Sequence, residues 1–194
     1  MIKKELELNK NILVNCVEKC LQNARELFEE AELLKNNKKY PRAYTLYHLC
    51  NEEIGKTFII FQYLIQNDYS NVKVKKFYSE FTNHKPKIKT SRNILKIMLL
   101  LIQKEISEED YNNLTYTKEA IENLNNYKNL SLYSFIENKS VFKPSDMFGL
   151  DEVNLIRPQS ELCLKYSEKF CRLALKDIDM FIKMTSENLK KNNG

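Results

Sequence analysis

Residues 41–66 read PRAYTLYHLCNEEIGKTFIIFQYLIQ, and this stretch decides the fold. Its apolar side chains recur at steps of three and four residues, which is the period of an α-helix. Pro41 stands where a first helical turn tolerates proline. Ile59 and Ile60 lie away from the main apolar stripe, so the helix is apolar on more than one side. That distribution is typical of a central helix, and it predicts an all-α fold built around this segment.

Periodic stretches on both sides of this segment predict an antiparallel bundle of about five to six helices. The polar turn 36–39 is short enough to make the first two helices an antiparallel hairpin. The other helices are expected over about 6–35, 72–83, 90–104, 107–126 and 159–190. Pro86 is expected to interrupt the chain after the third helix. Residues 127–158 have no sustained period, and Pro144, Gly149 and Pro158 fall there, so one long irregular loop is predicted.

Composition agrees with a single helical domain over residues 1–194. The chain is 43% hydrophobic and holds only 3 glycines and 4 prolines, too few for the many turns of an all-β protein. The N-terminus lacks the apolar region of a signal peptide, and the apolar run 94–102 is about half a membrane span. Five cysteines without CxxC spacing are expected to be free thiols in a reducing compartment. We therefore expect a cytoplasmic protein without membrane attachment, and its net charge of +5 permits contact with RNA.

The segment Asn51-Glu52-Glu53-Ile54-Gly55-Lys56 is the first candidate for site chemistry. Gly55 costs about 1 kcal/mol relative to alanine within a helix, so close approach of another group is its natural explanation. Glu53 lies at the edge of the apolar stripe and should be partly buried, which requires a cationic or hydrogen-bonding partner. Lys56, Lys87 and Arg92 are the candidate partners. The Glu52–Lys56 spacing equally suits a solvated surface pair, and packing and site chemistry remain equal alternatives here.

His84 is the candidate acid or base. It lies at a predicted helix end beside Lys85 and Lys87, whose charges could hold a phosphate. The spacing of Arg42 and His48 fits an Arg-x(4–6)-His pattern, although six residues along a helix separate their side chains by about 120°. Tyr133, in the predicted loop, could pack or bind a carboxylate or a phosphate. Arg42, His48, Glu52, Tyr133 and Arg92 are further candidate residues.

No P-loop, Rossmann fingerprint, zincin motif or nucleophile elbow occurs in the chain. Two histidines and dispersed cysteines do not suit a closed zinc site, so we expect neither a metal nor a cofactor. Metal-independent ribonucleases remain possible, because their chemistry needs only a few scattered polar groups.

Three landmarks resemble the AbiV family of abortive infection proteins, a branch of the HEPN helical domains. They are the hairpin carrying Tyr40-Pro41-Arg42 and Glu52-Glu53-Ile54-Gly55-Lys56, the His84-x-x-Lys87 element, and Lys128-x-x-Ser131-Leu132-Tyr133. The resemblance implies a HEPN-type bundle, usually dimeric. It also implies a polar cleft lined by Glu53, Lys56, His84 and Lys87 and closed by a partner subunit. In that cleft His84 would be the acid or base, Glu53 would orient a cation, and Lys56 or Lys87 would hold the scissile phosphate.

The resemblance further implies an antiphage effector that arrests translation or growth of the infected cell. It would be a homodimer triggered by a phage-encoded protein. It would act on RNA or ribosomes and not on DNA, and it could be a HEPN-like endoribonuclease. No arginine lies four to six positions before His84, which departs from the usual HEPN ribonuclease pattern. The alternative is therefore a non-catalytic dimeric binding module that blocks RNA, a ribosome or a phage protein by occupancy.

Overall fold

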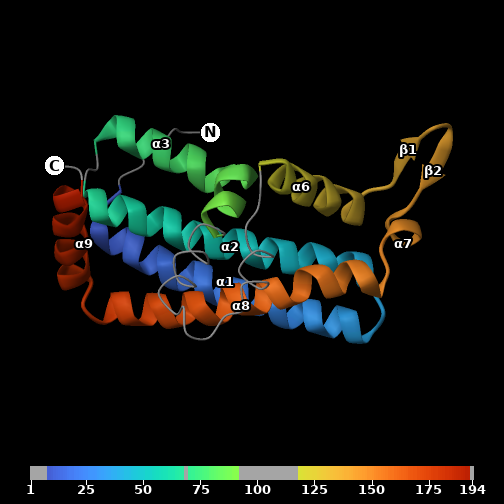
Figure 1. Cartoon of the computed structure of the whole chain (residues 1–194), viewed down its shortest axis with the longest axis horizontal. Coiled ribbons are helices and arrows are strands. Elements are labelled where there is room, and N and C mark those ends of the chain that lie inside the picture. The colour runs from blue at the N-terminus through green and yellow to red at the C-terminus, as the bar shows by residue number, and fades with distance from the viewer. Residues whose placement is uncertain (1–7, 68–69, 92–117, 193–194) are drawn as a thin grey trace, which may run out of the picture.

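The computed structural model describes residues 8–67, 70–91 and 118–192. Three long helices lie side by side along its length: α1 (Lys10–Asn36), α2 (Tyr40–Gln66) and α8 (Leu150–Lys176) (Figure 1). The side chain of Asn9 caps α1 by accepting a hydrogen bond of 3.0 Å from the Ile12 N–H. A short turn then joins α1 to the antiparallel α2, as the sequence predicts.

Helix α2 is the centre of the bundle. It packs against α1 along one side and against α8 and α6 (Lys118–Leu132) on others. Ile59 and Ile60, which point away from its main stripe, are both buried. The prediction of a central helix is therefore confirmed.

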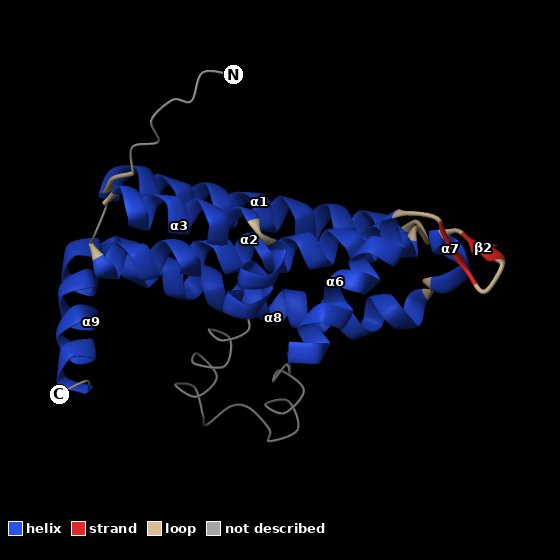
Figure 2. Cartoon of the chain, turned by 90° about the horizontal axis from the view of Figure 1, so that it is seen from above, coloured by secondary structure: helices blue, strands red, loops and turns tan. Residues whose placement is uncertain are grey.

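Shorter helices cover the bundle and close its two ends. α3 (Asn71–Thr82) lies along α2, and residues 84–91 form a further helical segment, here called helix 84–91. α9 (Ile178–Asn192) runs across one end of the bundle. The opposite end carries α7 (Pro144–Met147) and a small antiparallel hairpin of β1 (Phe135–Glu137) and β2 (Ser140–Phe142) (Figure 2).

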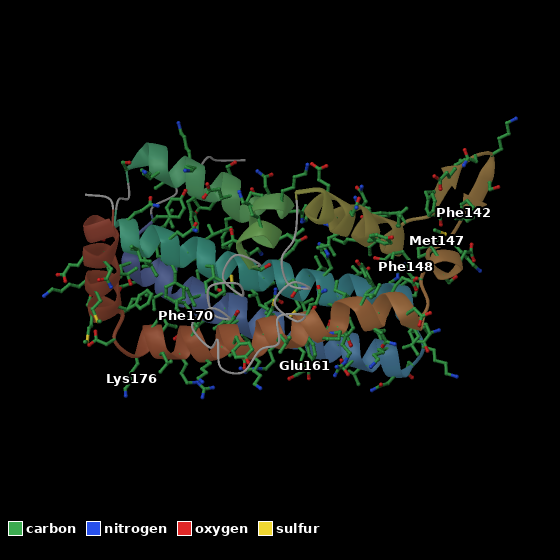
Figure 3. The ribbon with its side chains drawn as sticks, viewed as in Figure 1. Phe142, Met147, Phe148, Glu161, Phe170 and Lys176 are labelled. Atoms are coloured by element: carbon green, nitrogen blue, oxygen red, sulfur yellow. The ribbon has the colours of Figure 1, made fainter. Side chains whose placement is uncertain are left out.

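Two aromatic clusters fill the core at different heights along α2. Phe58, Phe61 and Phe170 meet near the α9 end, with ring centroids 5.2–6.5 Å apart. Tyr44 and Phe148 meet near the hairpin end, 5.0 Å apart. Figure 3 marks Phe170 and Phe148 at these two ends. The polar residues of α2 described below lie between the two clusters along the helix.

The fold class is confirmed, but the long loop predicted over 127–158 is wrong. α6 continues to Leu132, and α8 begins at Leu150, so the irregular region is short and holds the hairpin and α7. Pro158 lies inside α8, although proline removes a hydrogen bond and costs about 3 kcal/mol in a helix interior. Burial of Val153, Ile156 and Ser160 around it outweighs that cost.

Two further helix boundaries also differ from the prediction. The helix expected from about residue 90 begins at His84, directly after the break at Asn83, so Pro86 stands in its first turn, where its missing N–H is not needed. The predicted C-terminal helix is divided at Asp177 into α8 and α9. Most of the predicted helix 90–104, the start of the helix predicted over 107–126, and the apolar run 94–102 lie outside the described residues.

All five cysteines are free, and all but Cys16 are buried, in agreement with the prediction. No helix within the described ranges combines the length and apolar character needed to cross a membrane.

Candidate functional site

A polar stripe follows one face of helix α2. Thr45, His48 and Glu52 are each 3% exposed or less, and Gly55 continues the same face one turn further on. Steps of three and four residues keep these positions on one side of the helix. Helix 84–91 and α6 cover this side, so the stripe meets polar residues of both segments.

Glu52 is the centre of this meeting point. His84 Nδ1 lies 2.6 Å from Glu52 Oε2 and 2.8 Å from Oε1, and Lys87 Nζ lies 3.0 Å from Oε2. Lys128 Nζ, from α6, donates to Oε1 at 3.3 Å, and His48 Nε2 lies 3.2 Å from the same oxygen. One carboxylate therefore joins α2, helix 84–91 and α6. We call these five side chains the Glu52 cluster.

The surroundings of Glu52 keep its carboxylate ionised. Burial alone would raise its pKa, but hydrogen bonds from His48, His84 and Lys87 and the charge of Lys128 lower the pKa far below the ordinary value. A buried carboxylate is stable only when charged partners and hydrogen bonds compensate for its lost hydration. The cluster supplies two buried ammonium groups to one carboxylate, so its basic charge exceeds its acidic charge.

Gly55 permits the contact between α2 and helix 84–91. A Cβ atom at this position would lie 1.9 Å from the carbonyl oxygen of Lys87 and 2.6 Å from its carbonyl carbon. Both atoms belong to backbone and cannot move aside cheaply. The sequence predicts close approach at Gly55, and this contact confirms it. The approach brings the backbone of Lys87 against α2, one turn of the helix beyond Glu52.

Polar contacts from α6 fix the other side of the cluster. Thr45 Oγ1 and Ser131 Oγ lie 2.7 Å apart, and Ser131 Oγ donates to the Lys128 carbonyl. Arg42 Nη1 donates to the Leu132 carbonyl at 3.2 Å, at the C-terminal end of α6. Favourable interaction of a cation with the last carbonyls of a helix explains this position.

Arg42 and His48 therefore occupy different environments. Arg42 is exposed at the end of α6, whereas His48 is buried beside Glu52. This separation agrees with the divergence expected from their six-residue spacing.

The four residues assigned to one cleft divide into two groups. His84 and Lys87 contact Glu52, whereas Glu53 Oε1 forms an ion pair with Lys56 Nζ. The Lys56 ammonium also lies 5.0 Å from the ring centre of Phe81, at the end of α3. Glu53 therefore has one of its expected partners, Lys56, whereas His84 and Lys87 contact Glu52 instead.

The remaining candidates lie elsewhere. Tyr133 follows the last residue of α6 and is 65% exposed. Arg92 lies outside the described residues. Lys128 was missed as a site residue, although its spacing of one helical turn from Ser131 was the available signal. A lysine and a serine that share a helix face with the apolar Leu124 indicate a polar contact beneath the surface.

The arrangement suits acid–base chemistry at His84. A carboxylate that accepts the Nδ1 hydrogen of an imidazole fixes the ring and its tautomer, and leaves Nε2 to exchange a proton with another molecule. The side chain of Glu52 is 3% exposed and that of His84 is 51% exposed. His84 is therefore the part of the cluster that an external substrate reaches. No group of three or more potential metal ligands occurs among the residues described.

Comparison with known proteins gives one family match. Residues 12–163 match the family model HEPN_AbiV, described as AbiV. The matched range includes every member of the Glu52 cluster and covers well over half of the chain. No curated protein and no solved structure gives a match.

Proposed function

The chain belongs to the AbiV family of HEPN domains, and from that premise we propose that it arrests the infected cell by cleaving RNA at His84. Membership of the family places the protein in abortive-infection defence against phage. The observation that carries the chemical part is the contact between the buried Glu52 carboxylate and Nδ1 of the half-exposed His84. This geometry supports a metal-independent endoribonuclease.

In the proposed reaction the neutral His84 imidazole accepts a proton at Nε2 from a ribose 2′-hydroxyl. The 2′-oxygen then bonds to the adjacent phosphorus as the bond to the 5′-oxygen breaks. A proton returned by the imidazolium or by solvent neutralises the leaving oxygen, and a cyclic phosphate remains. Glu52 stabilises the imidazolium that forms, because its negative charge lies beside Nδ1.

The resemblance implied that Lys87 could hold the scissile phosphate, but we assign a different role to Lys87 and to Lys128. Both ammonium groups face Glu52 and their side chains are 6% exposed, so they set the charge and position of the carboxylate. We assign them as positioning residues and not as direct ligands of the scissile phosphate.

The proposal includes control by infection. A constitutive nuclease of this kind would kill its own host, so the protein is latent until a phage-encoded protein is present. We propose that it acts as a homodimer, as is usual for the HEPN domains that it resembles.

The test is cleavage of tRNA and ribosomal RNA by purified protein, with and without extract from phage-infected cells. Wild-type protein should cleave RNA with the extract, and His84→Ala should lose cleavage while retaining its fold. Lys89→Ala is the matched control, because Lys89 is an exposed residue of the same helical segment as His84. RNA that stays intact with wild-type protein in every condition, even at high protein concentration, would exclude the nuclease.

A non-catalytic binding module is the second candidate. The observation that favours it is that the Glu52 cluster ties three helical segments together, which is also what a purely structural network does. The phage resistance of cells carrying His84→Ala separates the two functions. Lost resistance with a normal melting curve supports catalysis, whereas full resistance supports binding by occupancy.

A further inference from the structure

The hairpin end of the molecule carries a basic surface that is separate from the Glu52 cluster. Residues 33–51 contain no aspartate or glutamate, yet they include Lys35, Lys38, Lys39 and Arg42. These four residues lie in the last turn of α1, the connecting turn and the first turn of α2. All of them are exposed except Lys35, which is half-buried.

Two exposed tyrosines of the α6 end lie beside this surface. Residues 123–136 also contain no acidic residue, and they include Tyr127 and Tyr133, which are 48% and 65% exposed. The hydrogen bond from Arg42 to the Leu132 carbonyl places Tyr133, the next residue, at the start of α2. The ring of Tyr127 lies 6.4 Å from that of Tyr44, which fixes its position against α2.

We propose that this basic and aromatic surface binds the backbone and bases of single-stranded RNA. Exposed cations such as Lys38 and Lys39 attract phosphates, and exposed aromatic rings stack on unpaired bases. An acidic protein would be attracted by the cations but would not need the two exposed rings. The combination therefore favours single-stranded nucleic acid, and the proposed cleavage at a 2′-hydroxyl requires that this be RNA.

The position of the surface relative to His84 suits a substrate that reaches both. Arg42 and Glu52 are ten residues apart on α2, which is about 15 Å along a helix. Arg42, Thr45 and Glu52 face the same neighbour, α6, so the path between them stays on one side of α2. The inference deepens the proposed function, on which it rests, by assigning the surface that holds RNA away from the reacting bond.

Binding is tested separately from cleavage. A labelled single-stranded oligoribonucleotide is titrated with full-length His84→Ala protein and followed by fluorescence anisotropy. The double variant Lys38→Glu/Lys39→Glu, made in the same background, should bind about tenfold more weakly at low salt. Its dependence of log affinity on log salt should flatten by about 1.4, because each lost phosphate contact on a single strand removes about 0.7.

The matched control is Lys169→Glu/Lys176→Glu, which makes the same change of charge on exposed residues of α8. Lys176 lies at the α9 end of the bundle, far from the hairpin (Figure 3). The control should keep nearly the affinity of the His84→Ala protein. Equal weakening by both double variants would overturn the proposed surface, because only net charge would then matter.

The aromatic part of the surface has its own test. Tyr133→Ser leaves the charge unchanged and should weaken binding roughly tenfold through lost base stacking, with no change in the salt dependence. Unchanged affinity in this variant would contradict base stacking at Tyr133.

If the oligonucleotide does not bind even at low salt, the surface serves another partner and the inference is wrong. If the oligonucleotide binds to this surface but wild-type protein leaves RNA intact, only the proposed nuclease is contradicted.

Discussion

At the scale of single residues, the position of Glu52 determines what the site can do. Two adjacent glutamates in α2 point about 100° apart, so they meet different partners. Glu52 receives two lysines and two histidines from three helical segments, whereas Glu53 receives Lys56 from its own helix. The charge of Glu52 is thus part of both the fold and the proposed chemistry.

Removing the charge of Glu52 should destabilise the protein strongly. Glu52→Gln leaves the buried ammonium groups of Lys87 and Lys128 without their carboxylate, and a broken buried ion pair costs about 3–5 kcal/mol. Urea denaturation of wild type and variant measures the difference. Glu122→Gln removes an exposed partner of Lys85 and should change stability by less than about 1 kcal/mol. Similar losses in both variants would show that Glu52 is not a buried ion-pair partner.

Gly55 offers a second test at this scale. Gly55→Ala should destabilise the protein by about 1–3 kcal/mol, because the new methyl group overlaps the backbone of Lys87. This range is the net effect: the steric cost is larger still, because it also offsets the roughly 1 kcal/mol gained from alanine's better helix propensity. Denaturation midpoints measure the net effect.

Gly149→Ala is the matched control for Gly55. A Cβ atom at Gly149 would meet nothing closer than 3.6 Å, so the change should be less than about 1 kcal/mol. A Gly55→Ala protein that is as stable as wild type, or more so, would contradict the close approach of helix 84–91 to α2.

At the scale of secondary structure, α8 shows packing overriding a local rule. Its interior holds Pro158, which a pattern-based assignment places at a helix boundary. Ser160, two residues later, is fully buried and accepts a hydrogen bond of 2.9 Å from Asn51 Nδ2 on α2. Burial of the residues around the proline holds the helix together across it.

Substitution of this proline should stabilise α8. Pro158 is exposed, so Pro158→Ala loses little packing and restores a backbone hydrogen-bond donor. We expect the free energy of unfolding to rise by up to about 3 kcal/mol, measured by thermal and urea denaturation. Pro144→Ala, in the first turn of α7, should have no such benefit because that position needs no N–H. A loss of stability in Pro158→Ala would mean that the proline bend is itself required for packing.

At the scale of the whole molecule, the buried carboxylate makes stability depend on pH. The pKa of Glu52 in the folded protein lies below its ordinary value, so its contribution is present above that value and is lost as the pH falls toward the folded pKa. The pKa of Glu32 is also lowered: burial opposes the shift, but hydrogen bonds from Tyr47 and Arg157 outweigh it. Both groups predict a protein that weakens in acid.

The contribution of Glu52 can be isolated by comparing two stability curves. The difference in unfolding free energy between wild type and Glu52→Gln should be large at neutral pH. It should shrink as the pH falls below about 4.5, the ordinary value for glutamate, since the unfolded wild-type chain then takes up a proton. Urea denaturation at a series of pH values measures it. A difference that does not change with pH would mean that Glu52 titrates normally in the fold.

The sequence by itself determined the fold class, the bounds of α2 and α3, and the family. The bounds of α2 and α3 follow from apolar periodicity and from Pro41, because these signals are local to each helix. Family membership follows from the landmarks around residues 52–56, 84–87 and 128–133, which all lie within the matched range. Gly55 also predicted a close approach by another group, since glycine is costly within a helix, but not that this group is the backbone of Lys87.

Only the tertiary structure decided which polar residues meet. Periodicity places Glu52 and Glu53 on neighbouring faces but does not say which face helix 84–91 and α6 will cover. It likewise could not show Lys128 beside Glu52, since 76 residues separate them in the chain. Packing of α6 against α2 made Glu52 the central carboxylate, because burying it required two lysines and two histidines from three segments. Side-chain partners of this kind depend on contacts distant in sequence, whereas helices depend on residues a few positions apart.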